Sequence, residues 1–260
     1  MQNLNYGVIG NCSTAALISE KGAIEWLCFP EFDSPSVFAA ILDRQKGGHF
    51  GFKVTSDYKV TQSYVPHTNI LSTHFESEEG AFDVVDFMPC YPTSDGKDFY
   101  RPAEIYRYIR WAKGRPRMKV DYRPAPNYAR GKTIYNVTSQ YVETYSSVEN
   151  KDRQYLYSSL DLKKVVNHDE ITLEKDEFFL FSFNEKVIPV DIEREKLEYC
   201  RTLVYWLNWT DHAKRYTRYN EVIERSMLVL KLMTYRNGAV MAAVTTSLPE
   251  TVGEVRNWDY

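Results

Sequence analysis

The chain has 260 residues, of which 43% are hydrophobic and 26% charged, and a formal net charge of −3. These values are typical of a globular protein and exclude a disordered chain. The nearly balanced charge provides no basic face for nucleic acid, so we expect no nucleic-acid partner.

Membrane and secretion signals are absent from the sequence. No apolar run approaches the roughly 20 residues that a membrane-spanning helix needs. The first residues have no basic segment followed by an apolar core, which a signal peptide would have. Four cysteines without CxxC spacing indicate free, mostly buried thiols in a reducing compartment. We therefore expect a cytoplasmic protein with no membrane partner.

Residues 1–190 predict strands separated by tight turns. Short β-prone runs alternate with the turn signals Lys21-Gly22, Gly47-Gly48, Glu79-Gly80, Asp95-Gly96 and Arg130-Gly131. Many short strands with regular turn signals favour an antiparallel sandwich. The first of these turns is predicted to close a hairpin.

Three runs have the strongest strand signals. Residues 81–87 are β-prone, and residues 134–145 alternate with period two through their centre, so each run is interpreted as one strand. Residues 178–183 are nearly all apolar, which predicts a strand covered on both faces.

The pattern changes after Pro189 and predicts a helix over residues 192–209. Asp191 can cap its first turn, because a carboxylate accepts hydrogen bonds from free backbone amides. Apolar residues then recur at spacings of three and four, which is the stripe of an amphipathic helix: Leu197, Cys200, Val204 and Leu207.

A second helix is predicted over residues 221–235, with Asn220 as its cap. Its apolar residues cover more than one face, so we expect burial on several sides. Asn237-Gly238 is predicted to stop the helix in the left-handed conformation.

Metal and cofactor chemistry finds no support in the sequence. The five histidines (49, 67, 74, 168 and 212) have no metal-ligand spacing, and neither a serine-hydrolase elbow nor a phosphate-binding loop is present. We predict no cofactor and no metal.

Two carboxylate pairs, Glu31 with Asp33 and Asp83 with Asp86, are candidates for acid–base chemistry. A glycosidase pair must face one cavity. Asp83 and Asp86 would lie on opposite faces of one strand, and prolines around the other pair indicate a structured loop. Hydrogen-bonded or solvated carboxylates are the favoured interpretation of both pairs.

The final residues Trp258, Asp259 and Tyr260 combine unlike chemistries at a place where chains normally fray into polar residues. We therefore expect the chain to be the front part of a longer enzyme.

Several segments resemble prokaryotic glycoside hydrolase family 15, which contains glucoamylase-like enzymes and related trehalases. The segments are residues 7–17, 22–30, 32–35, 86–89, and the tail 242–250 with 256–260. The resemblance implies a mainly β fold: a large antiparallel β-sandwich (super-sandwich), followed by a linker helix and the first helix of a truncated (α/α)6 barrel. The implied boundaries are 1–190 for the sandwich, 191–218 for the linker and 219–260 for the first barrel helix and its loop.

The family chemistry implied by this resemblance is inverting hydrolysis of α-glucosidic bonds by two carboxyl groups. Both groups are expected in the C-terminal α/α barrel beyond this chain, so no catalytic residue is assigned and the chain alone is expected to be inactive. The resemblance gives Tyr260 a substrate-lining role, with Trp258 and Asp259 as neighbours. The full-length parent's substrate is expected to be an α-glucan or α-glucoside.

Two questions stay open. The 20 tyrosines and 5 tryptophans also suit a free-standing carbohydrate-binding or interaction module. Within the family, the parent could act on α-1,4 glucans, α-1,6 linkages or trehalose. An apolar helix over 221–235 that lacks barrel partners is also expected to cause self-association.

Overall fold

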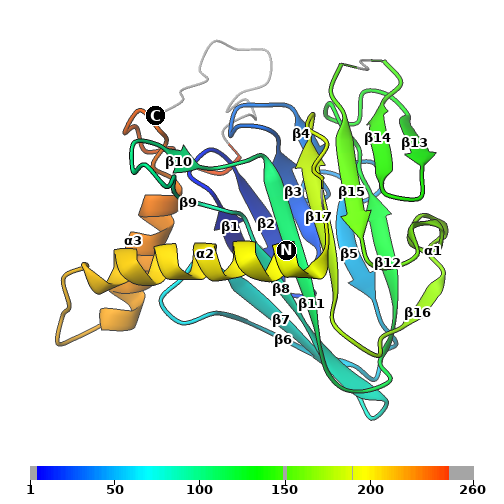
Figure 1. Cartoon of the computed structure of the whole chain (residues 1–260), viewed down its shortest axis with the longest axis horizontal. Coiled ribbons are helices and arrows are strands. Elements are labelled where there is room, and N and C mark those ends of the chain that lie inside the picture. The colour runs from blue at the N-terminus through cyan, green and yellow to red at the C-terminus, as the bar shows by residue number, and fades with distance from the viewer. Residues whose placement is uncertain (1–4, 149–150, 189, 246–260) are drawn as a thin grey trace.

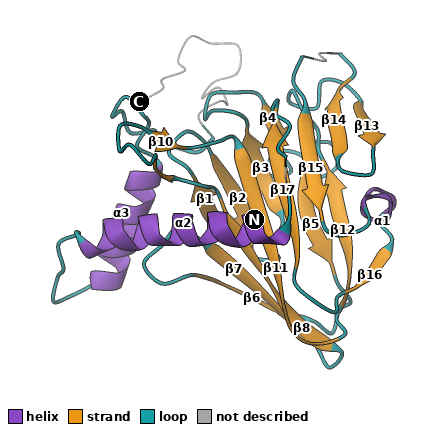
Figure 2. Ribbon diagram, in the orientation of Figure 1, coloured by secondary structure: helices purple, strands orange, loops and turns teal. Residues whose placement is uncertain are grey.

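The computed structural model describes residues 5–148, 151–188 and 190–245. Two antiparallel sheets pack face to face, and helix α2 lies across the outer face of the second sheet (Figure 1; Figure 2). The chain is mainly β, and the predicted antiparallel sandwich is confirmed.

The first sheet has seven strands in the order β1-β2-β3-β5-β12-β16, with β4 paired to β3. Its strands are β1 (Tyr6–Gly10), β2 (Ala15–Ser19), β3 (Ile24–Cys28), β4 (Ser36–Phe38), β5 (His49–Lys53), β12 (Arg117–Arg123) and β16 (Glu170–Thr172).

The second sheet has eight strands in the order β13-β14-β15-β17-β11-β8-β7-β6. Its strands are β6 (Lys59–Tyr64), β7 (Leu71–Glu76), β8 (Gly80–Phe87), β11 (Glu104–Gly114), β13 (Thr133–Val137), β14 (Val142–Ser146), β15 (Gln154–Ser158) and β17 (Glu177–Phe183). A separate short hairpin pairs β9 (Tyr91–Pro92) with β10 (Phe99–Tyr100).

Aromatic side chains fill the space between the sheets. The ring of Phe50 on β5 meets that of Phe179 on β17 edge to face, at a centroid distance of 5.3 Å. Phe38 contacts Phe181 across the same interface at 5.5 Å. Edge-to-face and tilted pairs are the favoured geometries of aromatic rings, so much of the aromatic surplus is used inside the sandwich.

The strand predictions with continuous apolar runs are confirmed. Every residue of β17 is buried. Phe179 and Phe181 contribute to the core between the sheets, whereas Phe178 and Leu180 contribute to the core under the helices. The hairpin of β2 and β3 also forms, with Gly22 at a φ of 74° in its turn.

Two predictions inside the β region are wrong. Residues 134–145 form two strands, β13 and β14, instead of one. The hydroxyl of Thr138 accepts hydrogen bonds from the amides of Gln140 and Tyr141, so a threonine supports the turn without glycine or proline. A short helix, α1 (Leu162–Asn167), also interrupts the strands; Asp161 caps it by accepting from the Lys163 amide.

Helix α2 (Ile192–Asp211) forms as predicted, and the Asp191 side chain accepts from the Arg194 amide as its cap. Its orientation differs from the expectation that an apolar stripe faces a core. Leu197 is 48% exposed and Val204 63%. The buried face carries instead Glu195, Glu198, Thr202, Tyr205, Trp206 and Thr210.

Helix α3 (Asn220–Leu232) is shorter than predicted, and its start differs. Tyr219, in the left-handed conformation, occupies the cap position, while the Asn220 side chain accepts from the Tyr216 amide before the helix. Asn220 is therefore not the cap. Gly238, at a φ of 89°, follows the helix end by several residues and shapes a later turn.

Among the described residues, α3 is packed along one side only, against the expectation of burial on several sides. Leu228, Leu232 and the following Met233 are buried, whereas Val222 and Leu230 are exposed. Within the described residues, neither α2 nor any other helix combines the length and apolar character needed to cross a membrane.

Candidate functional site

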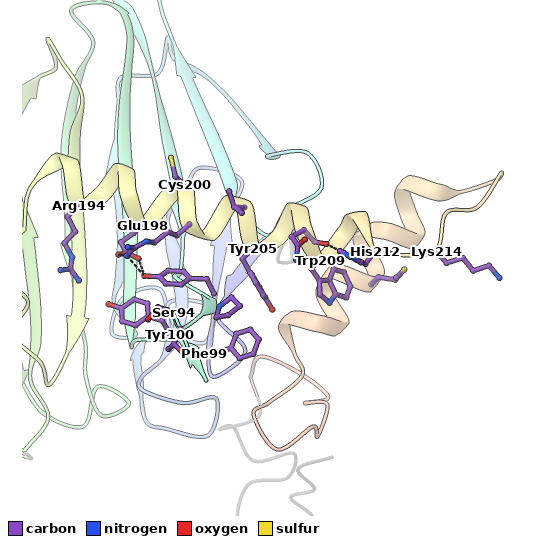
Figure 3. Close-up of a pocket in the computed structure, with 18 residues that line it drawn as sticks. Ser94, Phe99, Tyr100, Arg194, Glu198, Cys200, Tyr205, Trp209, His212 and Lys214 are labelled. Carbon is purple, nitrogen blue, oxygen red and sulfur yellow. Dashed lines mark hydrogen bonds and ion pairs between the residues drawn. The ribbon is translucent and has the colours of Figure 1, made fainter. Parts of the chain in front are cut away.

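A cleft of about 1470 Å³ lies between α2, α3 and the β9–β10 hairpin (Figure 3). We call it the α2 cleft. Five aromatic residues line it, together with charged groups at one end: Tyr91, Phe99, Tyr100, Tyr205 and Trp209, with Arg194, Glu198 and Arg201.

The β9–β10 hairpin places three of these rings beside the helix. Its turn is fixed by Thr93, whose hydroxyl donates to Asp95 Oδ1 at 2.6 Å. The rings of Tyr91 and Tyr100 lie 5.1 Å apart across the hairpin, and Phe99 meets Tyr205 of α2 edge to face at 5.9 Å. Aromatic contacts thus join the hairpin to α2 and form one wall of the cleft.

Glu198 forms the polar end of the cleft, where it is almost fully buried. Its Oε2 accepts from the Tyr91 hydroxyl at 2.7 Å, and its Oε1 accepts from Arg201 Nη1 at 3.4 Å. Burial raises the pKa of the Tyr91 hydroxyl, and the hydrogen bond to Glu198 adds to the shift. Tyr91 is therefore a stable donor at neutral pH.

A second set of hydrogen-bonded polar residues, Arg194, Tyr106 and Glu104, lies at the polar end of the cleft. Arg194 Nε donates to the Tyr106 hydroxyl at 3.2 Å, and that hydroxyl donates to Glu104 Oε2 at 2.9 Å. Burial raises the pKa of the Glu104 carboxyl, and the Tyr106 bond and the charge of Arg194 oppose the shift. Of these three residues only Arg194 lines the cleft.

Glu195 lies on the neighbouring face of α2 and is buried under the helix. Burial raises its pKa well above the ordinary value, and the negative charges of Asp86, Glu104 and Glu198 add to the shift. Its Oε1 has no hydrogen-bond partner among the described residues. Glu195 does not line the cleft.

The described lining of the cleft provides aromatic and hydrogen-bonding groups and one carboxylate. Glu198 is the single carboxylate among the described residues lining the cleft, and each of its oxygens already has a partner. Inverting hydrolysis needs two carboxyl groups roughly 6.5–9.5 Å apart with room for water between them. Flat rings beside hydrogen-bonding charges do match the apolar faces and hydroxyls of a sugar.

None of the carboxylates weighed from the sequence, Glu31, Asp33, Asp83 and Asp86, lines this cleft. Trp258, Asp259 and Tyr260 lie outside the described residues. Glu31 pairs with Arg236 at 3.2 Å in a loop. Asp83 and Asp86 project from opposite faces of β8, as predicted: Asp83 bonds to His74 and Arg110, and Asp86 bonds to Arg107.

The sequence does not predict the cleft. Its walls come from residues 91–100, 194–214 and Met227, and the first two of these are about a hundred positions apart. One local signal was present: Tyr91, Phe99 and Tyr100 flank the Asp95-Gly96 turn, a pattern typical of a short hairpin with aromatic residues at its base.

Comparison with known proteins defines the class as the N-terminal domains of glycoside hydrolases. The chain belongs to the trehalase-like N-terminal family, whose model matches residues 5–150. The glucoamylase-like part of the resemblance has no counterpart among the similar proteins described below.

Several curated relatives align along nearly the whole chain. A trehalase of Thermoplasma acidophilum is 32% identical over 254 residues, which cover 94% of this chain and 42% of the relative. Trehalase 1 of Sulfolobus acidocaldarius is 34% identical over 262 residues, covering 98% and 42%. A Mycolicibacterium smegmatis trehalase is 29% identical over 287 residues, covering 98% and 42%. The chain thus spans about two fifths of the length of these relatives.

Proposed function

We propose that this chain is the non-catalytic N-terminal part of an inverting glycoside hydrolase that cleaves trehalose. The observation that carries the proposal is the alignment of proteins named trehalase along 94–98% of the chain. In this proposal, residues 1–190 form the sandwich, 191–218 the linker helix region, and 219–260 the first helix and loop of an α/α barrel.

The α2 cleft supports the non-catalytic part of the proposal. Glu198, the one carboxylate that lines it in the described part of the chain, is engaged by Tyr91 and Arg201. A general acid and a general base, which inverting hydrolysis requires, would then come from the C-terminal barrel of the parent enzyme. The substrate-lining role of Tyr260, next to Trp258 and Asp259, belongs to the same proposal.

The activity of the isolated chain tests the assignment directly. We expect the purified 260-residue chain to release no glucose from trehalose, maltose or starch. Sustained turnover of any of the three by the chain alone would contradict the proposal.

A chimera tests the proposed parent activity. The chain replaces the aligned stretch of the Thermoplasma acidophilum trehalase, and the intact relative serves as the positive control. We expect glucose release from trehalose in preference to maltose. A folded chimera that hydrolyses maltose or starch but leaves trehalose intact would argue for a glucoamylase-like parent instead.

A second candidate function, a carbohydrate-binding module, is favoured by the five aromatic residues of the α2 cleft. Titration calorimetry of the chain with trehalose and malto-oligosaccharides separates the two functions. Phe99, 40% exposed in the cleft, and Trp111, 37% exposed outside it, provide matched alanine variants. Tight binding that Phe99→Ala abolishes and Trp111→Ala preserves would favour the module.

A further inference from the structure

Two buried thiols lie side by side where four parts of the chain meet. Cys12 is in the turn between β1 and β2, and Cys90 is in the connection between β8 and β9. Their sulfur atoms are 4.0 Å apart, and the residues are 2% and 1% exposed. Contact between two thiols from such distant positions gives the pair a chemistry that a single buried cysteine lacks.

The backbone of Cys12 is in an unusual conformation for a residue with a side chain. Its φ is 65°, in the left-handed region where glycine is the residue of lowest conformational cost. The turn is held by Asn11, whose Oδ1 accepts from the amides of Ser13 and Thr14. The turn therefore keeps the sulfur of Cys12 against that of Cys90, and an uncommon conformation of this kind points to a use for the side chain.

The thiol pair also contacts both helices. Cys12 Sγ donates to the Lys231 carbonyl of α3 at 3.4 Å. Cys90 is hydrogen-bonded to Tyr205 of α2, a residue that lines the α2 cleft. The sulfur atoms therefore contact α3 and a residue of the cleft wall directly.

The two thiols differ in acidity. The hydrogen bond from Cys90 lowers the pKa of the Cys12 thiol, and the charges of Lys231 and Arg101 contribute, while burial opposes the shift. The same hydrogen bond and burial raise the pKa of Cys90. Cys12 is consequently the thiol that ionises first, and a thiolate is the form that reacts with an oxidant.

We propose that Cys12 and Cys90 form a reversible redox site, which a hydroperoxide converts from a dithiol to a disulfide. The Cys12 thiolate attacks one peroxide oxygen, the O–O bond breaks, and Cys12 becomes a sulfenic acid as the other oxygen leaves as water. The Cys90 sulfur then attacks the Cys12 sulfur, and the S–O bond breaks. The departing hydroxide takes the Cys90 proton.

The reaction balances without another reactant. Two thiols and one hydrogen peroxide give one disulfide and two waters; the sulfur atoms are oxidised and the peroxide oxygens reduced. A small external thiol reverses the step by exchange. The disulfide joins the β1–β2 turn to the β8–β9 connection. Cys12 then has no S–H to donate to the Lys231 carbonyl, so the last turn of α3 loses one hydrogen bond.

The test uses the full chain with Cys200→Ser, because Cys200 is exposed and would react on its own. Hydrogen peroxide is added to the native protein, and peptides are mapped by mass spectrometry without reduction. We expect one cross-link joining the peptides that contain Cys12 and Cys90, with Cys28 still a thiol. The melting temperature should rise by several degrees, and dithiothreitol should reverse both changes.

Two variants make the test decisive. Cys12→Gly suits the left-handed backbone, so it keeps the turn and should show no peroxide-dependent change in melting temperature. Cys90→Ser keeps Cys12, whose sulfenic acid should then be trapped by dimedone. The proposal is overturned if both thiols persist in native protein at a peroxide concentration that oxidises Cys200 in the unsubstituted chain, or if they pass to sulfinic acids without forming a cross-link.

Discussion

Arg107 and Asp86 form an ion pair that is completely buried between the two sheets. Arg107 Nε donates to Asp86 Oδ1 at 2.7 Å, and both side chains are 0% exposed. The same guanidinium donates to the carbonyls of Phe50, at 2.6 Å, and Gly22, at 2.5 Å, and stacks 4.7 Å from the Phe50 ring centroid. Because Arg107 is on the second sheet and Phe50 on the first, this one side chain connects the two.

Arg107→Met should therefore be severely destabilising. It leaves the Asp86 carboxylate buried without a cation and deprives two carbonyls of their donor, which costs about 3–5 kcal/mol of unfolding free energy. Arg110→Met is the matched control on the same strand, because Arg110 is 55% exposed and pairs with Asp83. Urea denaturation should show a loss below about 1 kcal/mol for the control. Equal losses in the two variants would contradict the role given to the buried pair.

The sequence predicts those parts of the fold in which local pattern and burial agree. β17 is buried on both faces, so its nearly continuous apolar run is a sufficient signal. Asp83 and Asp86 are an odd number of residues apart on β8, which places them on opposite faces in any strand. The sequence does not predict the turn at Thr138, because a side-chain hydroxyl makes its hydrogen bonds and threonine is also a common strand residue.

The orientation of α2 and the cleft beside it could not be predicted. The helix covers a sheet face that presents Glu104 and Tyr106, and these polar groups pair with Arg194 of the helix. Its buried face is accordingly part polar, and its apolar stripe points outward. A single sequence gives no information on which distant polar groups will face a helix, so the periodicity fixes that α2 exists but not how it is turned.

Glu195→Gln should make stability less dependent on pH. Burial raises the pKa of the Glu195 carboxyl in the folded chain, whereas in the unfolded chain it is about 4.3. Between these two values the unfolded state loses a proton that the folded state keeps, so folding is weakened as pH rises, by at most about 1.4 kcal/mol per pH unit.

Glu195→Gln should be as stable as the unsubstituted chain near pH 4 and more stable than it at pH 8, as measured by urea denaturation. Glu193→Gln, which changes an exposed carboxylate on the same helix, is the control. Its unfolding free energy should equal that of the unsubstituted chain at both pH values. If the stability of Glu195→Gln and that of the unsubstituted chain changed with pH in the same way, the Glu195 carboxyl would ionise as easily in the folded chain as in the unfolded one.

Asp121→Asn should also make stability less dependent on pH, but here the stability that the carboxylate provides is lost as the pH falls. Burial raises the pKa of the Asp121 carboxyl, but hydrogen bonds from Lys53, His49 and Arg123 together outweigh it, so the pKa lies well below its usual range. A depressed pKa contributes stability that is present above the unfolded value of about 3.9 and is lost as pH falls toward the folded value. At pH 7 the variant should lose about 2 kcal/mol. The difference in unfolding free energy between the variant and the unsubstituted chain should shrink as the pH falls from about 4 to 2. A constant difference over that range would contradict the depressed pKa of Asp121.

The outward stripe of α2 should be dispensable for the fold of this chain. Leu197→Lys and Val204→Lys place charges at positions 48% and 63% exposed, so each should change the unfolding free energy by less than about 0.5 kcal/mol. Trp206→Ala, on the buried face, should cost about 3–5 kcal/mol. Thermal and urea unfolding check both values. Large losses from the two lysine variants would mean that the stripe faces a core.

Self-association through residues 221–235 remains a prediction, and the structure identifies the positions that test it. Val222 is 66% exposed and Leu230 58%, on a helix packed along one side only. Burying such side chains between two copies removes apolar surface from water, which favours association as concentration rises. Light scattering should therefore show a mass that increases with concentration, and Val222→Lys with Leu230→Lys should restore a monomer without loss of melting temperature. The pair Leu197→Lys and Val204→Lys tests whether association runs through α2 instead. If only that pair abolishes the increase in mass, the copies associate through α2 and the prediction for 221–235 is wrong.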